Sequence, residues 1–242
     1  MTTKNRKYTD KDEHKLGAMF DSIAMRYDFL NHFLSLGIDK YWRRKTVHCI
    51  LKDDPLNILD LATGTADLAI AMALNSKRCQ ITAVDISEQM LKIAQNKINK
   101  KKLQQRIKLY NSSALSLSLE ADTFDAVSIG FGIRNFYDIH KGLSEIHRVL
   151  KDKGKLYILE FSKPRNIIIK CMYNFYFSNL LPWIGKQLSG HKYAYTYLNQ
   201  TAVEFPDGVT FMDILSKNGF VQLTKKSLSF GIVTLYIANK EQ

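Results

Sequence analysis

Short apolar runs alternate with longer segments of helical periodicity along most of this chain. Runs that predict β-strands lie at 58–61, 81–84, 107–110, 124–130 and 156–159. After the second run, Met90, Leu91, Ala94 and Ile98 recur at helical spacing, and Ser87 is the expected N-cap of that helix. The pattern therefore predicts strands that alternate with helices.

The C-terminal part of the chain changes this pattern. A helical period over 139–150 is expected to end at Gly154, because glycine is common just after a helix C-terminus. Another helix is expected near 209–217, closed by Asn218-Gly219, and two strands follow near 221 and 232–238. The whole pattern predicts a Rossmann-like α/β fold, with a mostly parallel seven-stranded sheet, helices on both faces and an antiparallel C-terminal edge.

A turn of small residues joins the first predicted strand to the next helix. Gly64 lies in this turn, and Asp85 stands 21 positions later, at the end of the second strand. A glycine lets a ligand approach the backbone, and an aspartate here can accept hydrogen bonds from both hydroxyls of a ribose. The three glycines of G-x-G-x-x-G, which wrap a pyrophosphate, are missing. We therefore expect a nucleoside without phosphates, S-adenosylmethionine (SAM) being the common one; simple packing in an α/β domain is the alternative.

Ligands of such sheets bind beyond the carboxyl ends of the strands, where the strand order reverses. Four segments fall at these ends: Gly64-Thr65, Asp85, Ser113-Ala114 and 130–135. Their convergence on one crevice is a stronger argument for a binding site than any single motif.

The net charge of +12 points to nucleic acid or an anionic membrane surface as a partner. Seven Lys and Arg residues and no acid lie between 92 and 108, which is most simply the solvated face of a helix. Acids are also absent between 161 and 203, where basic residues alternate with aromatic ones. This second segment suits a membrane interface, and a lid that only completes the core is the alternative.

Cysteine spacing and the N-terminal residues bear on compartment and metal binding. The three cysteines never occur as C-x-x-C, so we expect neither a disulfide framework nor a metal site. The first residues are charged and show no apolar secretory region. We expect a cytoplasmic protein, with peripheral contact to the inner face of the cell membrane as a further expectation.

Several longer motifs resemble one family, the quinone-biosynthesis C-methyltransferases. These are F-G-I-R-N at 131–135, R-V-L-K-x-x-G at 148–154, L-E-F-S-K-P at 159–164 and F-D-S-I-A-x-x-Y-D-x-x-N at 20–31. The resemblance runs from about residue 17 to 238. It implies a class I SAM-dependent methyltransferase that methylates the ring of demethylmenaquinol or of the related ubiquinone-precursor benzoquinol.

The resemblance also implies site residues. Thr65 and Asp85 would contact SAM, Asp85 at the ribose, and Ser113 and Ala114 would lie beside the adenine. Ser113 lacks the carboxylate or amide that the family more often has there, so only its backbone contact is expected. Asp39 stands where the family often has His, and we assign it no catalytic role.

Methyl transfer to a ring carbon requires a hydroxyl of the acceptor to lose its proton, and a fixed cation stabilises the resulting anion. Arg134 is the catalytic candidate, with Asn135 orienting the same oxygen or a water. The alternative for Arg134 is a structural ion pair with Asp138. Tyr27 and Asp28 are candidates for a lid over SAM, with capping and core packing as the alternative.

We predict demethylmenaquinol as the acceptor, the benzoquinol as the first alternative, and an RNA methyltransferase or a non-enzymatic SAM-binding protein as further ones. Residues 1–45 are expected to form a helical lid over the cofactor site, and 46–242 the methyltransferase domain. Within it, 164–203 is expected to be an aromatic and basic insertion that covers the acceptor site. The expected partners are an isoprenoid quinol and, transiently, a membrane surface, with no nucleic acid; a homodimer is left open.

Overall fold

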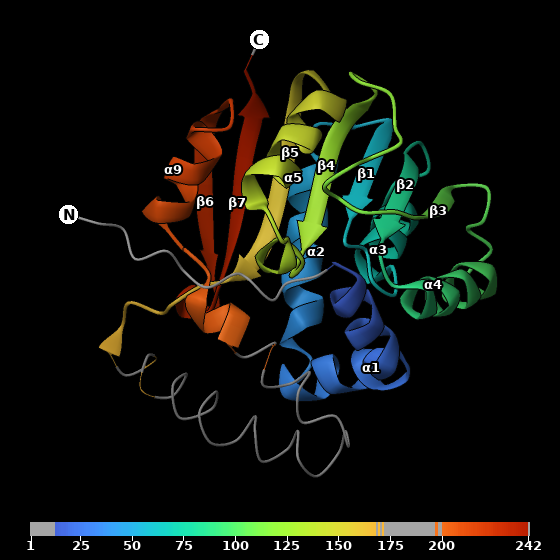
Figure 1. Ribbon diagram of the computed structural model, residues 1–242, viewed down its shortest axis with the longest axis horizontal. Helices are drawn as coiled ribbons and strands as arrows, with labels where there is room; N and C mark the ends of the chain where they lie inside the picture. Colours follow the sequence, from blue (N-terminus) through green and yellow to red (C-terminus); the bar gives the residue numbers. More distant parts are fainter. Residues whose placement is uncertain (1–12, 168, 170, 172–196, 198–199, 242) are drawn as a thin grey trace.

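The computed structural model describes residues 13–167, 169, 171, 197 and 200–241. The strands form one seven-stranded sheet of order β3-β2-β1-β4-β5-β7-β6 (Figure 1). The strands are β1 (Asn57–Leu61), β2 (Gln80–Asp85), β3 (Ile107–Asn111), β4 (Phe124–Gly130), β5 (Leu150–Phe161), β6 (Phe220–Leu228) and β7 (Val233–Lys240). Neighbours among β1 to β5 are parallel, and β7 runs antiparallel to both β5 and β6. The predicted sheet and its antiparallel edge are confirmed.

The described helices surround this sheet. They are α1 (Glu13–Leu34), α2 (Ile38–Leu51), α3 (Asp67–Asn75), α4 (Glu88–Lys100), α5 (Ile139–Val149) and α9 (Val209–Ser216), with short 3-10 turns η1 (Ile133–Asn135) and η3 (Ser229–Gly231). The predicted cap of α4 is confirmed, since Ser87 Oγ accepts a hydrogen bond from the backbone N–H of Met90.

Two apolar cores lie on opposite faces of the sheet. On one face, residues of α2, α3 and α4 such as Ile50, Met72 and Ile98 pack against alternate strand positions such as Ile58 and Ile81. On the other, α5 and α9 pack against the intervening strand residues, which are Leu59, Val127, Ile129, Leu156 and Ile158 among others. Strand order reverses between β1 and β4, so the loops after these strands open a crevice at the carboxyl-end edge.

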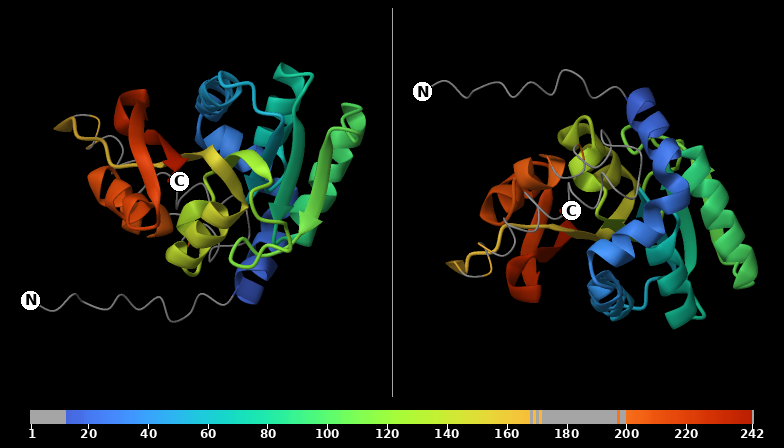
Figure 2. Two further views of the ribbon diagram at one scale, coloured as in Figure 1. Left: turned by 90° about the horizontal axis from the view of Figure 1, so that it is seen from above. Right: turned by 90° about the horizontal axis from the view of Figure 1, so that it is seen from below.

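Helix α1 crosses this edge of the sheet, as the views from the side and from below show (Figures 1 and 2). Met19, Ile23 and Ala24 form a small apolar cluster with Met90 of α4. Asp21 strengthens the contact, because its Oδ1 accepts hydrogen bonds from Ser87 Oγ (2.6 Å) and from the backbone N–H of Gln89 (2.9 Å). Helix α1 is thereby fixed above the loops that follow β1 and β2.

The expected boundary between residues 45 and 46 falls inside α2. Trp42, Val47 and Ile50 of this helix are all buried in the same core. Most of the expected insertion at 164–203 lies outside the described residues.

Gly154 does not end a helix. Helix α5 stops at Val149, and β5 begins at Leu150, so Gly154 lies inside this strand. The register of β5 against β4 shifts here, and a Cβ on Gly154 would lie 2.7 Å from the carbonyl oxygen of Lys151. The glycine is required by this close approach within an irregular strand, which the sequence pattern alone does not distinguish from a helix end.

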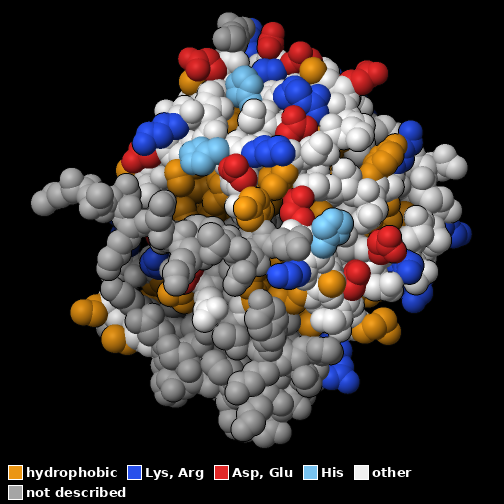
Figure 3. Space-filling view, viewed as in Figure 1, with side chains coloured by type: hydrophobic (Ala, Val, Ile, Leu, Met, Phe, Trp, Pro, Cys, Tyr) orange, Lys and Arg blue, Asp and Glu red, His pale blue; other side chains and the backbone are white. Residues whose placement is uncertain are grey.

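Basic and acidic side chains are interspersed over the face shown in Figure 3. Within the described part of the chain, no helix has the length and apolar character needed to cross a membrane.

Candidate active site

The loop after β1 adopts an uncommon backbone conformation. Ala62, Gly64 and Ala66 all have positive φ, at 51°, 56° and 64°. Such angles are unfavourable for residues with a Cβ and concentrate at functional sites. Apart from Gly64 and its two chain neighbours, no described residue has an atom within 4 Å of a Cβ built on Gly64, so this glycine allows the turn and leaves the space beside it open.

Asp85 at the end of β2 holds this loop in place. Its Oδ2 accepts a hydrogen bond from the backbone N–H of Gly64 at 2.7 Å, and its Oδ1 accepts one from that of Ser87 at 2.9 Å. Burial raises the pKa of Asp85, and the hydrogen bonds from Ser87 and Gly64 oppose this shift. Each carboxylate oxygen retains a lone pair, so the group can also accept the two hydroxyls of a ribose.

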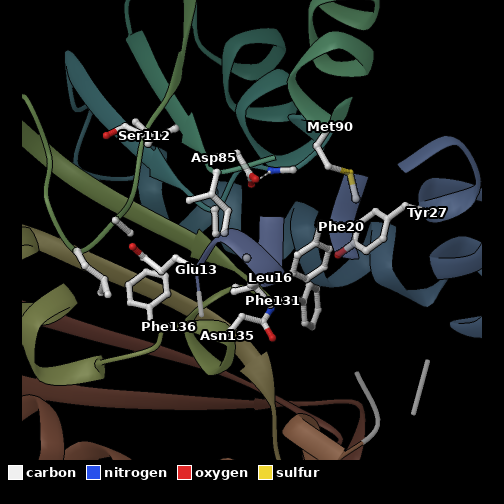
Figure 4. Close-up of a pocket in the computed structure, with 18 residues that line it drawn as sticks. Glu13, Leu16, Phe20, Tyr27, Asp85, Met90, Ser112, Phe131, Asn135 and Phe136 are labelled. Atoms are coloured by element: carbon white, nitrogen blue, oxygen red, sulfur yellow. Dashed lines mark hydrogen bonds between the residues drawn. The ribbon is translucent and has the colours of Figure 1, made fainter. Parts of the chain in front are cut away.

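A cavity opens beside Asp85, and α1 closes one side of it (Figure 4). From α1, Glu13, Leu16, Phe20 and Tyr27 line it, and the sulfur of Met90 of α4 points toward the last two of these. The remaining lining comes from loops at the carboxyl ends of β1, β2, β3 and β4: Ala62, Gly64, Val84, Ile86, Ser112, Ala114, Leu115, Gly130, Phe131, Gly132, Asn135 and Phe136.

Of the pair predicted beside the adenine, Ala114 lines this cavity and Ser113 does not. The hydroxyl of Ser113 instead donates a hydrogen bond to Glu13 Oε1 at 2.6 Å and accepts one from the backbone N–H of Leu115 at 3.0 Å. Glu13, the first residue of α1, does line the cavity. A carboxylate from the N-terminal helix therefore stands next to the position where Ser113 lacks one.

A second, larger cavity of about 520 Å³ lies on the other side of the β1 loop. Its volume falls in the usual range of ligand pockets, roughly 300–1,000 Å³. Three aromatic rings form one wall: the ring centroids of Phe131 and Phe161 are 4.9 Å apart, and Trp42 lies 6.0 and 6.2 Å from them. Its chemistry suits a flat, apolar molecule.

Arg134 lines this second cavity and is itself buried. Its Nη1 donates to the backbone carbonyl of Phe131 at 2.8 Å and to Glu160 Oε1 at 2.5 Å, and its guanidinium lies 5.3 Å from the centre of the Phe161 ring. The alternative of a structural ion pair between Arg134 and Asp138 is wrong about the partner. Asp138 caps α5 by accepting from the backbone N–H of Lys141, and Glu160 at the end of β5 pairs with Arg134.

Glu160 is completely buried. Burial raises the pKa of its carboxyl group, and the positive charge of Arg134 opposes that shift. Its second oxygen, Oε2, has no hydrogen-bond partner among the residues that the structure describes. Asn135 is also buried and lines the first cavity, and its Oδ1 likewise has no hydrogen-bond partner among the described residues.

The two cavities meet. Five residues line both of them: Tyr27, Ala62, Gly64, Gly130 and Phe131. Burial raises the pKa of Tyr27, an effect that the charge of Arg134 opposes, so the phenol remains protonated at neutral pH. The five shared residues thus form the junction at which the two cavities adjoin.

The side chain of Thr65 is turned away from the junction and toward α1 and α4. Its hydroxyl donates to Asp28 Oδ1 at 2.5 Å and accepts from Lys97 Nζ at 3.1 Å, and Lys97 also pairs with Asp28 and Asp67. This polar cluster ties α1 to the loop after β1. Thr65 thus has a visible structural role, and it lines the second cavity and not the first.

Asp39 belongs to a neighbouring network. It is buried and accepts hydrogen bonds from Ser35 and Arg43, with His32 Nδ1 at 2.7 Å. Burial opposes its ionisation, but the hydrogen bond from Ser35 and the charge of Arg43 outweigh burial and lower the pKa of Asp39. This arrangement holds the turn between α1 and α2.

Asp60 is, like Asp39, a buried acid that lines the second cavity. Its two oxygens accept hydrogen bonds from Ser128 Oγ at 2.5 Å and Thr63 Oγ1 at 2.6 Å. Burial nevertheless raises the pKa of Asp60 to about 6. Among the residues described, no cluster of three or more His, Cys, Asp or Glu could hold a metal ion.

Sequence reasoning placed Gly64, Asp85, Ala114 and Arg134 at the crevice but missed other lining residues. Glu13, Leu16, Phe20 and Met90 gave no local signal, because a helical apolar period does not show which partner a face contacts.

Comparison with known proteins agrees with this geometry. Residues 8–240 match the model of the ubiE/COQ5 methyltransferase family. A demethylmenaquinone methyltransferase of Bacteroides fragilis is 43% identical over 230 residues, covering 95% of this chain and 94% of the relative. The ubiquinone/menaquinone biosynthesis C-methyltransferase UbiE of Geotalea uraniireducens is 42% identical over 235 residues, covering 97% and 99%.

Solved structures of lower identity share the fold. A Thermotoga maritima protein, described as a SAM-dependent methyltransferase and possible histamine N-methyltransferase, superposes with a TM-score of 0.65 at 17% identity, covering 93% of this chain and 99% of that one. A SAM-dependent methyltransferase of Methanococcus maripaludis gives 0.64 at 19%, covering 92% and 94%. The architecture is that of class I SAM-dependent methyltransferases, and this chain belongs to the ubiE/COQ5 methyltransferase family.

Proposed function

We propose that this enzyme transfers a methyl group from SAM to a ring carbon of demethylmenaquinol, giving menaquinol. The observation that carries the proposal is the meeting of a cavity beside Asp85 with a larger, aromatic-walled cavity that contains Arg134. When bound, SAM would supply a methyl group on a positively charged sulfur: the ring carbon bonds to this methyl group as its bond to sulfur breaks, and S-adenosylhomocysteine is the leaving group. The ring carbon then loses its proton and the hydroxyl regains one, so that one proton per turnover is released to solvent. Such a methyl transfer requires donor and acceptor on opposite sides of one junction, and alignment of this kind contributes roughly 7–11 kcal/mol.

The residues beside Asp85 fit SAM. Asp85 has lone pairs for the ribose hydroxyls, and the open space beside Gly64 admits a group next to the backbone. Ala114 offers a small apolar surface for the adenine, and Glu13 offers an acceptor for its amino group. Thr65 and Ser113 contribute through their backbone in this proposal, because their hydroxyls already bind Asp28 and Glu13.

The acceptor must be activated before its ring carbon can attack. Ionising a phenol-like hydroxyl with a pKa of about 10 near pH 7 costs about 4 kcal/mol. The hydroxyl proton passes to solvent, and we assign stabilisation of the resulting anion to Arg134, whose guanidinium stays positively charged and lies in the wall of the acceptor cavity. In a site that excludes water, such a cation offsets much of the cost. Tyr27, still protonated, can donate a hydrogen bond to the same oxygen.

Glu160 positions Arg134. A charge pair that is buried in a low-dielectric wall has a fixed geometry, because separating the partners leaves a charge without compensation. Arg134 therefore presents its guanidinium to the cavity in one orientation, also restrained by the Phe131 carbonyl.

Residues 1–45 act as a lid in this proposal. Support comes from α1, which contributes Leu16, Phe20 and Tyr27 to the cofactor cavity. The segment 164–203 is proposed to cover the acceptor site and to contact the membrane surface, in a cytoplasmic protein that is peripheral on the membrane.

The test is methyl transfer from labelled SAM to reduced demethylmenaquinone, with the oxidised quinone as control. We expect label to enter only the reduced quinol, because only its hydroxyl can be ionised. Equal labelling of both forms would contradict activation through the hydroxyl. No labelling, with SAM binding intact, would reject the acceptor and lead to the benzoquinol assay and then to an RNA methylation assay.

The related benzoquinol is the second candidate acceptor. It is supported by the name of the Geotalea relative, which includes both ubiquinone and menaquinone biosynthesis. Competition between the two quinols at limiting enzyme would give the ratio of their kcat/KM values directly.

A further inference from the structure

A stripe of large apolar side chains runs along the outer face of α1. It consists of Met25, Phe29, Phe33 and Leu36, the last of these in the turn after the helix. All four are exposed, Met25 by 88% and Leu36 by 82%, and the rings of Phe29 and Phe33 stack with centroids 5.9 Å apart. Isolated exposed apolar residues are common, but a continuous row of them marks an interaction surface.

The stripe covers only one half of the helix. The same outer face begins with Lys15, Ala18 and Ser22, which are charged, small or polar and also exposed. Its character therefore changes along α1, from polar near the cofactor cavity to apolar near the acceptor cavity.

The apolar end of the stripe reaches the mouth of the acceptor cavity. Leu36 and Ile38 are exposed and also line that cavity. Phe230, from η3 between β6 and β7, lines it too and is 81% exposed. Phe230 adopts a positive φ of 58°, which is unfavourable for a phenylalanine.

The charge next to the stripe is positive. Helix α2 exposes Lys40, Arg44 and Lys45, and Lys45 Nζ lies 5.7 Å from the ring centre of the exposed Tyr41. The acids of residues 25–45 are not exposed, because Asp39 is buried and Asp28 binds Thr65 and Lys97.

From these observations we propose that the apolar stripe of α1, together with Phe230 and the basic residues of α2, docks on the surface of an anionic bilayer. Apolar and aromatic side chains would enter the interfacial region while Lys40, Arg44 and Lys45 face lipid phosphates. The acceptor cavity then opens toward lipid between Leu36 and Phe230. This inference rests on the proposed function, since a quinol with an isoprenoid tail can enter from the bilayer without leaving it.

A lipid surface fits better than a second copy of the chain. A two-fold dimer built on this stripe would bring the exposed cations of α2 from both copies to one interface, and residues 25–45 expose no acid that could pair with them. An anionic membrane instead complements those charges.

The test uses the full chain and a variant that carries Met25→Ser, Phe29→Ser and Phe33→Ser. None of these residues lines either cavity, so catalysis in solution should persist. The matched control carries Leu56→Ser and Leu74→Ser, which replace exposed leucines next to the opposite edge of the sheet. Binding is measured by flotation with phosphatidylcholine vesicles that contain or lack phosphatidylglycerol.

We expect the stripe variant to bind the anionic vesicles at least about tenfold more weakly than the wild type and the control. Its kcat/KM should fall similarly for a long-tailed quinol in vesicles but stay within about twofold for a short-tailed quinol in solution. Vesicle binding equal to the wild type, or a wild type that binds no vesicles, would overturn the proposal. So would a stripe variant that changes from dimer to monomer in sedimentation while its vesicle binding is unchanged. A wild type that binds vesicles through the stripe but methylates neither quinol would reject the proposed function and leave the docking surface standing.

Discussion

Gly132 lies against Ala62 with no room for a side chain between them. A Cβ built on Gly132 would lie 2.5 Å from the Cβ of Ala62 and 3.3 Å from the side chain of Ile129. This contact joins the loop after β4 to the loop after β1, the two strands between which the strand order reverses. The glycine thus brings together the loops that form the junction of the two cavities.

The variant Gly132→Ala should separate these loops. We expect its free energy of unfolding to fall by about 1–3 kcal/mol, because an added methyl group in a packed site forces its neighbours to move. The KM for SAM should rise as well, since Ala62 lines the cofactor cavity.

The control is Gly17→Ala in α1, where the added Cβ would lie 3.5 Å from the carbonyl oxygen of Ile86, an ordinary contact. An alanine inside a helix should raise the free energy of unfolding by up to about 1 kcal/mol. Urea unfolding of both variants checks the pair, and equal effects at the two glycines would contradict the close-approach argument.

Arg134 and Glu160 allow a test that separates chemistry from stability. Arg134→Gln leaves the buried Glu160 without its cation and should cost about 3–5 kcal/mol of unfolding free energy. The double variant Arg134→Gln with Glu160→Gln removes both charges and should recover most of that loss. Its kcat should stay about 10²–10³-fold below the wild type, because the cation near the acceptor oxygen is absent. Recovery of kcat in the double variant would show that Arg134 serves stability alone.

Glu13 should contribute to SAM binding from the N-terminal helix. Glu13→Ala removes the acceptor of the Ser113 hydroxyl, and we expect the KM for SAM to rise about tenfold with kcat nearly unchanged. Glu88→Ala is the matched control, since Glu88 is also a first-turn acid of a helix but is exposed and lines neither cavity. Steady-state kinetics with varied SAM checks both, and similar KM values for the two variants would contradict the role of Glu13.

Asp60 should make stability depend on pH. Folding raises its pKa from 3.8 to about 6, so the folded state holds a proton that the unfolded state has released between these values. Stability from this group is therefore present below about pH 4 and lost as pH rises through 6, a change of about 3 kcal/mol. Asp60→Asn should remove this loss. The free energy of unfolding of the variant, relative to that of the wild type, should therefore rise by about 3 kcal/mol from pH 4 to pH 7.

Asp125→Asn is the control of opposite sign. Burial raises the pKa of Asp125, but hydrogen bonds from Lys151 and the backbone N–H groups of Asn57 and Leu56 outweigh it and lower the pKa. The stability that Asp125 contributes is present above its unfolded pKa and is lost in acid. Urea unfolding from about pH 2 to pH 7 checks both, and parallel pH profiles for the two variants would contradict this assignment.

The sequence by itself determined the sheet, most of its helices and the loop that contains Gly64, because these depend on local periodicity and turn chemistry. Strand alternation, the cap at Ser87 and the spacing from Gly64 to Asp85 are all set within a few tens of residues. The place of Gly154 could not be predicted in this way. A glycine shortly after a helical period is compatible with a helix end and with a bulged strand, and only the pairing of β5 with β4 distinguishes the two.

Only the tertiary structure decided which side chains meet. Ser113 bonds to Glu13 from 100 positions away, Arg134 pairs with Glu160 and not with the nearby Asp138, and Leu36 shares a cavity mouth with Phe230. The sequence predicted a helical lid within residues 1–45 but not the partners of its faces. The inner face of α1 packs against α4 and the loops after β1 and β2, and this contact can form only when the sheet has brought these elements together. Local propensity therefore determined the elements, and burial of their faces against distant neighbours determined the site.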